Sequence, residues 1–110
     1  MYLSGIKNPN IHLPLPESTK ATELNSHVWH LFVIRTNQRD LLQKYLEKNN
    51  VQTLIHYPTP PHKQQAYAEW NDRSYPITEK IHNQTLSLPI GPTMSDEHVQ
   101  IVIELLNGFK

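Results

Sequence analysis

The segment HYPTPPH, residues 56–62, combines rings that form hydrogen bonds with prolines that stiffen the backbone. A neutral imidazole donates from one nitrogen and accepts at the other, and a phenol does both through one oxygen. Rings held on a stiff loop lose little conformational entropy when they meet a ligand. His56 and Tyr57 are therefore candidate contacts for a polyhydroxylated or phosphorylated ligand. From the residues alone, the alternative is that Tyr57 packs at the edge of the core and the prolines only turn the chain.

Other chemistry finds little support in the residue types. The chain has seven histidines, and His56 with His62 could suggest a pair of metal ligands. Zinc needs three or four ligands, and local spacing places no third one, so we predict no metal site. No serine stands on the sharp glycine turn that a serine hydrolase requires. There is no cysteine, which excludes thiol nucleophiles, thiolate metal sites and disulfide scaffolds.

Length and charge exclude further classes of protein. The 110 residues are enough for one domain with one core. Ten basic residues balance ten acidic ones, so no net field favours nucleic acid or an anionic membrane. No apolar run approaches the ~18 residues of a membrane span, and the first residues lack the pattern of a signal peptide. With the missing cysteines, which fit a reducing compartment, this predicts a cytoplasmic protein.

The elements that must position the rings are two strands with a helix between them. Residues 28–35, VWHLFVIR, are apolar on both alternating sets, which is typical of a central strand covered on both faces. Asn37 can cap a helix that runs through Asn49, with its leucines on one stripe. Residues 51–57 then predict a second strand, which the prolines end because they lack the amide hydrogen of a ladder.

Two short helices follow the proline loop. The spacing of apolar residues predicts the first over 62–70. Pro76 is favoured in the first turn of the second, which runs to about Thr85 with Ile77 and Ile81 facing inward.

A strand and a helix close the chain. Residues 85–88 predict a short strand that Pro89 stops. Ser95 caps a final helix whose positive first turn holds two acidic residues, and Gly108 follows its end. The order strand-helix-strand-helix-helix-strand-helix predicts a small α/β domain, a two-layer α+β arrangement with a short sheet covered by helices.

The first 27 residues carry three prolines and no long period, which predicts an irregular arm. Tyr2, Leu3 and Ile6 stand at the spacing of one helical face, so the start is either the tail of a helix or a frayed terminus.

Three segments together are specific enough to indicate a family. They are HVWHLFVIR, RDLLQKYLEKNNVQTLIHYPTPPHKQQAY and LSLPIGPTMSDEHVQIVIELL. In this order they resemble the C-terminal part of the DegT/DnrJ/StrS-type sugar aminotransferases. These are pyridoxal-phosphate enzymes of the aspartate aminotransferase fold (fold type I) that make amino sugars on nucleotide carriers. The resemblance implies that residues 28–110 are the small domain of such an enzyme and that 1–27 end its connection to a large domain upstream.

The resemblance also implies roles for four histidine and tyrosine residues. The family's IHYP segment helps surround the sugar, which makes His56 and Tyr57 substrate-binding residues. His30 and His62 match the pattern and would support the domain or line an interface.

The cofactor lysine of the family lies in the large domain, so no catalytic or cofactor-binding residue is expected in this chain. Lys80 follows a serine-aromatic segment, but it stands in a polar helical stretch and is expected to be a solvated surface lysine. The chain alone is therefore expected to be inactive and to bind no pyridoxal phosphate.

Two hypotheses follow. In the first, the full-length homodimeric enzyme transfers an amino group from an amino-acid donor to a nucleotide-linked keto sugar for amino-sugar or cell-surface polysaccharide synthesis. Its small domain supplies one wall of the substrate site. In the second, the chain is a free-standing ferredoxin-like module that binds a small molecule or another protein.

Overall fold

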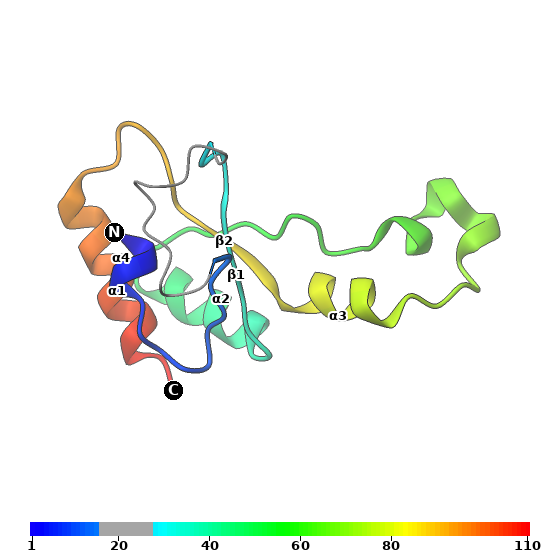
Figure 1. Cartoon of the computed structure of the whole chain (residues 1–110), viewed down its shortest axis with the longest axis horizontal. Coiled ribbons are helices and arrows are strands. Elements are labelled where there is room, and N and C mark those ends of the chain that lie inside the picture. Colours follow the sequence, from blue (N-terminus) through cyan, green and yellow to red (C-terminus); the bar gives the residue numbers. More distant parts are fainter. Residues whose placement is uncertain (16–27) are drawn as a thin grey trace.

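The computed structural model describes residues 1–15 and 28–110. Within these residues, two strands and four α-helices follow one another with two short 3₁₀ helices. They are α1 (Tyr2–Gly5), β1 (Phe32–Arg35), α2 (Arg39–Lys48), η2 (Pro61–Lys63), η3 (Gln65–Trp70), α3 (Pro76–Gln84), β2 (Thr85–Leu88) and α4 (Asp96–Gly108). Helices α1, α2 and α4 gather around the sheet, and residues 57–84 extend away from it (Figure 1).

The sheet is a short antiparallel pair. Phe32 of β1 lies opposite Leu88 of β2, and Arg35 lies opposite Thr85. The strand expected over 28–35 is therefore too long, because its partner offers only four residues for pairing. The strand expected over 51–57 is reduced to one antiparallel bridge, in which the backbone of Leu54 pairs with that of Ser87.

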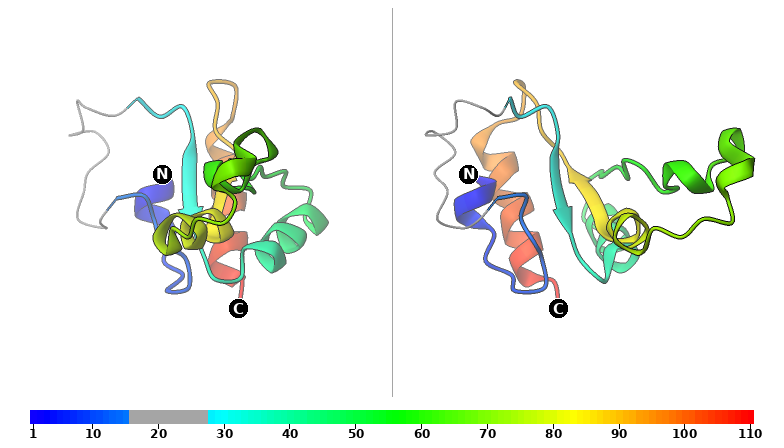
Figure 2. Two further views of the ribbon diagram at one scale, coloured as in Figure 1. Left: turned by 90° about the vertical axis from the view of Figure 1, so that its right-hand side faces the viewer. Right: turned by 45° about the vertical axis from the view of Figure 1, so that its right-hand side comes forward.

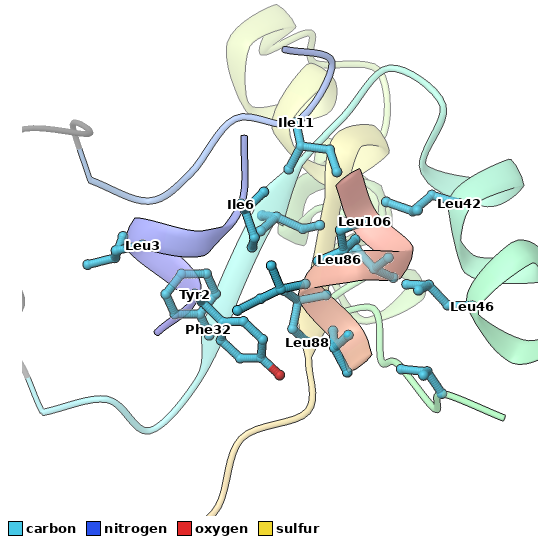
Figure 3. Close-up of a cluster of buried hydrophobic side chains, with 14 residues drawn as sticks. Tyr2, Leu3, Ile6, Ile11, Phe32, Leu42, Leu46, Leu86, Leu88 and Leu106 are labelled. Atoms are coloured by element: carbon cyan, nitrogen blue, oxygen red, sulfur yellow. The ribbon is translucent and has the colours of Figure 1, made fainter. Parts of the chain in front are cut away.

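The core lies where three helices meet the sheet (Figure 3). Leu42 and Leu46 of α2 and Leu106 of α4 are fully buried, as are Ile34 and Leu86 of the two strands. Burial of about five such side chains, each worth about 1.5–3 kcal/mol, is the main term that stabilises this arrangement.

The N-terminal residues belong to this core. Tyr2 and Leu3 of α1 are buried, so the alternative of a frayed terminus is wrong for these residues. The Tyr2 hydroxyl donates to the carbonyl of Pro89 at 2.7 Å. Gly5 lets α1 approach α4 closely, because a Cβ there would lie 2.6 Å from Cδ1 of Ile103. Residues 16–27 of the expected arm, and the boundary expected after residue 27, lie outside the described residues.

Residues 57–84, which we call the projection, stand out from the rest of the molecule on the side opposite both termini (Figures 1 and 2). The radius of gyration is 15.4 Å, against about 13 Å for a compact domain of this length. The helix expected over 62–70 is instead two 3₁₀ segments, and η3 is itself kinked at Tyr67, whose φ of −120° is not helical. Helix α3 begins with Pro76 at its first turn, as predicted.

Helix α3 shows the reverse of the predicted orientation. Ile77 and Ile81 do not face inward, since they are 77% and 36% exposed. The side chains that α3 turns toward the other limb of the projection are polar, namely Glu79 and His82. Polar hydrogen bonds therefore decide the orientation of this helix in place of apolar burial.

Of the two predicted N-caps, that of α4 is confirmed and that of α2 is wrong. Ser95 caps α4, with its Oγ accepting a backbone N–H of the first turn at 3.3 Å, and Gly108 is the last residue of α4 in place of the first one beyond it. Asn37 does not cap α2, whose N-cap is Gln38. The Asn37 side-chain carbonyl instead accepts from the Gln84 amide. Within the described residues, no helix has the length and apolar character to cross a membrane.

Candidate functional site

The predicted pair His56–Tyr57 lies where the chain leaves the sheet and enters the projection. The imidazole Nδ1 of His56 lies 2.8 Å from Oγ of Ser87 in β2. The Tyr57 carbonyl accepts a hydrogen bond from Nδ1 of His82 in α3 at 2.6 Å. The peptide bond between His56 and Tyr57 is cis, and their rings meet edge to face with centroids 5.4 Å apart. Both residues are thus held by residues later in the chain, in β2 and α3.

A third histidine connects the two limbs further out. Nε2 of His62, a residue only 4% exposed, donates to the Glu79 carboxylate at 2.8 Å, and its ring packs edge-on against Tyr75. The hydrogen bond from His62, together with that from the Tyr75 backbone N–H, lowers the pKa of the Glu79 carboxyl below its ordinary 4.5. Asn71 closes the tip by donating to the His62 carbonyl at 2.8 Å. The projection is therefore an antiparallel pair of limbs joined by side chains.

An open groove of about 890 Å³ lies beside the sheet at the base of the projection. Its wall includes His30, Thr53, His56, Ser87 and Pro89. Nε2 of His56 has no hydrogen-bond partner in the part of the chain that the structure describes. The Thr53 hydroxyl is likewise buried and unpaired among these residues. Of these two atoms, Nε2 of His56 is the one that a ligand in the groove could satisfy, because the Thr53 hydroxyl is fully buried.

The structure places two of the four residues singled out from the sequence in the groove and the other two outside its wall. His56 and His30 line the same groove, His30 from the segment before β1. Tyr57 is 64% exposed, so the alternative that it packs at the core edge is wrong. His62 does not line the groove and lies within the projection, where it pairs with Glu79. A supporting role for His62 fits this position.

Sequence reasoning missed the residues that hold the pair, Ser87 and His82. Ser87 offers one signal that could have found it, because it is a hydroxyl in the middle of TLSL, a strand buried at every position. A buried hydroxyl needs a partner, and a histidine at the end of the preceding extended segment is an available one. No comparable signal marks His82, whose partner is a backbone carbonyl.

The chain's own lysines do not fit a pyridoxal-phosphate site. A lysine that forms a Schiff base must be desolvated or lie beside other cations. Every lysine in residues 1–15 and 28–110 is exposed, including Lys80. The same residues hold no group of three or more histidine, aspartate or glutamate side chains placed to bind a metal ion.

Comparison with known proteins places this chain in a family. Residues 1–107 match the model of the DegT/DnrJ/EryC1/StrS aminotransferase family. The chain belongs to this family. It is 55% identical, over 98% of its length, to dTDP-3-amino-3,6-dideoxy-alpha-D-galactopyranose transaminase of Aneurinibacillus thermoaerophilus. It is 40% identical, over 94% of its length, to dTDP-3-amino-3,4,6-trideoxy-alpha-D-glucose transaminase of Streptomyces venezuelae.

Solved structures confirm the predicted fold. The crystal structure of S. venezuelae DesV in complex with a ketimine intermediate superimposes over 96% of this chain with a TM-score of 0.80 and 39% identity. NtdA of Bacillus subtilis, solved with bound cofactor PMP, gives a TM-score of 0.72 and 31% identity over 89% of this chain. The chain thus has the fold of one part of the fold type I aminotransferases.

The chain spans only part of these proteins. It covers 28% of the A. thermoaerophilus relative and 28% of the DesV chain. The described residues form a two-stranded sheet, whereas a ferredoxin-like module is built on four strands. The comparisons therefore favour the aminotransferase hypothesis over a ferredoxin-like module.

Proposed function

We propose that this chain is the C-terminal small domain of a pyridoxal-phosphate aminotransferase that acts on a nucleotide-linked keto sugar. The relatives support the substrate class, since two of them are transaminases of dTDP-linked deoxy sugars. A role in polysaccharide synthesis is supported by a more distant relative, the spore coat polysaccharide biosynthesis protein SpsC of Bacillus subtilis. In the full-length homodimer, an amino acid such as glutamate would donate the amino group.

The chain's contribution is one wall of the substrate site, formed by His56 and Tyr57. The observation that carries this assignment is Nε2 of His56, which has no partner among the described residues; its ring lines the groove and is held at the other nitrogen. A ring fixed on one side loses little entropy when a ligand binds on the other. The exposed Tyr57 phenol can donate to or accept from a sugar hydroxyl or a diphosphate oxygen.

Pyridoxal phosphate would be held outside this chain. When bound, it supplies the carbonyl on which the amino group is carried between donor and sugar. Since every described lysine is exposed, we assign no Schiff-base lysine to the described residues and derive no step through the cofactor. His56 and Tyr57 would bind and orient the sugar, and transamination by the chain alone is not expected.

The test is steady-state kinetics of the full-length enzyme with the substitutions His56→Ala and Tyr57→Phe. Loss of a hydrogen bond to a charged diphosphate lowers kcat/KM by about tenfold to a hundredfold. The matched control is His98→Ala, which removes an exposed histidine of α4 and should leave kcat/KM unchanged. Wild-type kcat/KM in the His56→Ala enzyme would show that the assigned wall is wrong.

A further inference from the structure

The hydroxyl of Ser87 contacts the imidazole of His56 from a buried position in β2. Ser87 is 4% exposed and stands in the middle of β2, where its backbone N–H and carbonyl pair with Leu54. Its Oγ lies 2.8 Å from Nδ1 of His56. Among the described residues, this nitrogen is the hydroxyl's one partner.

The direction of this hydrogen bond follows from the bonding capacity of the two groups. A serine hydroxyl carries one hydrogen, and a neutral imidazole carries its hydrogen on one of two nitrogens. If Nδ1 of His56 carried the hydrogen, the Ser87 hydroxyl hydrogen, in a residue only 4% exposed, would have no acceptor among the described residues. That arrangement is disfavoured by about fivefold to a hundredfold, the cost of one buried unsatisfied donor. Ser87 therefore donates and Nδ1 accepts.

The structure assigns Ser87 as a positioning residue that holds His56 in the tautomer with its hydrogen on Nε2. The imidazole then presents a donor to the groove, and the ligand atom that meets it is an acceptor oxygen, such as a carbonyl, hydroxyl or diphosphate oxygen. This inference rests on the proposed function, in which His56 contacts the sugar nucleotide. It adds which atom of His56 does so, in which tautomer, and why a serine stands in a buried strand.

The chain itself allows a direct test. Two-bond ¹H–¹⁵N spectra of the chain carrying ¹⁵N-labelled histidine distinguish the two tautomers, at about pH 8 where a free imidazole is neutral. A His56→Gln variant identifies the signals, and His98, exposed on α4, serves as the reference for a ring in water. We expect only the Nε2–H pattern for His56 in the wild type. In Ser87→Ala, we expect the tautomer mixture of His98.

Two variants separate this role from a general loss of packing. Ser87→Thr keeps the hydroxyl and should keep the wild-type pattern. Thr85→Ala is the matched control, because Thr85 lies two residues earlier in β2 and its buried hydroxyl has no partner among the described residues. An Nδ1–H pattern in the wild type would overturn the inference, as would an unchanged His56 spectrum in Ser87→Ala. If Ser87→Ala does not fold, the wild-type and Ser87→Thr spectra decide.

Turnover of the full-length enzyme gives an independent readout. Ser87→Ala should reduce kcat/KM about threefold to tenfold, Ser87→Thr should restore it, and Ser87→Ala should add nothing in a His56→Ala background. Equal losses in both backgrounds would show that Ser87 acts without His56. If His56→Ala has no effect while the spectra follow the expected pattern, the proposed function fails and the tautomer assignment remains.

Discussion

The hydroxyl of Tyr2 provides a quantitative test of how the N-terminal helix is attached to the rest of the fold. Tyr2→Phe keeps the ring that packs on Phe32 at 5.0 Å between centroids and removes only the hydrogen bond to the Pro89 carbonyl. Loss of one buried neutral hydrogen bond costs about 1 kcal/mol. We therefore expect the variant to unfold about 1 kcal/mol more easily at pH 8.

Alkaline pH should reverse this difference. Burial raises the pKa of Tyr2 from 10.0 to about 12. Because the folded state keeps the proton to a higher pH than the unfolded state does, the contribution of Tyr2 to stability is complete below pH 10 and declines as pH rises toward 12. At pH 11 the loss amounts to about 1.4 kcal/mol. Because this loss exceeds the hydrogen-bond contribution of about 1 kcal/mol, the two proteins should become equally stable below pH 11, and the variant should be the more stable one at pH 11 and above.

Urea unfolding followed by circular dichroism at intervals from pH 8 to 12 measures both terms. All other ionisable groups are the same in both proteins, so the difference between wild type and variant isolates Tyr2. A constant difference across this range would refute the argument, because it would mean that the Tyr2 hydroxyl titrates as it does in the unfolded chain.

Two further predictions concern the projection. The hydrogen bond from His62 holds the pKa of Glu79 below 4.5, so the ionised carboxylate stabilises the fold above that pH and loses this effect as pH falls. In urea unfolding, the stability advantage of wild type over Glu79→Gln should therefore shrink from pH 6 to 3. An advantage that does not depend on pH would contradict the pairing. Ile77→Ser, at a position 77% exposed, should change the unfolding free energy by less than about 0.5 kcal/mol. The buried comparison, Leu42→Ala, should cost about 2–5 kcal/mol, and equal losses at the two positions would show that Ile77 is covered.

The elements that local signals determine were predicted well. A proline in the first turn placed the start of α3, and Ser95 placed the start of α4. Strand β2 ends before Pro89 as expected, since proline cannot continue the ladder. The pair His56–Tyr57 was singled out by residue type and spacing; the structure puts His56 on a groove wall, and the binding role of the pair stays a prediction.

Features that depend on distant residues could not be predicted. Residues 28–31 were predicted to belong to the first strand, but pairing ends at Phe32 because β2 is short. Helix α3 exposes Ile77 because His62 and Tyr57, far along the chain, offer hydrogen bonds to its polar face. Amphipathic periodicity assumes that burial decides orientation, and this helix shows polar contacts deciding it instead.

The attachment of the first residues to the last ones has a consequence for the kinetics of folding. Asn8, 98 and 101 residues distant in sequence from its partners, donates to the carbonyls of Leu106 and Phe109 at the end of α4. Tyr2 likewise reaches Pro89 across 87 residues. The limbs of the projection, by contrast, are joined over 17 and 25 residues. Closing the longer loops costs more entropy and slows folding. We therefore expect the projection to form early and the N-terminal segment to dock last, onto a sheet and α4 that are already assembled.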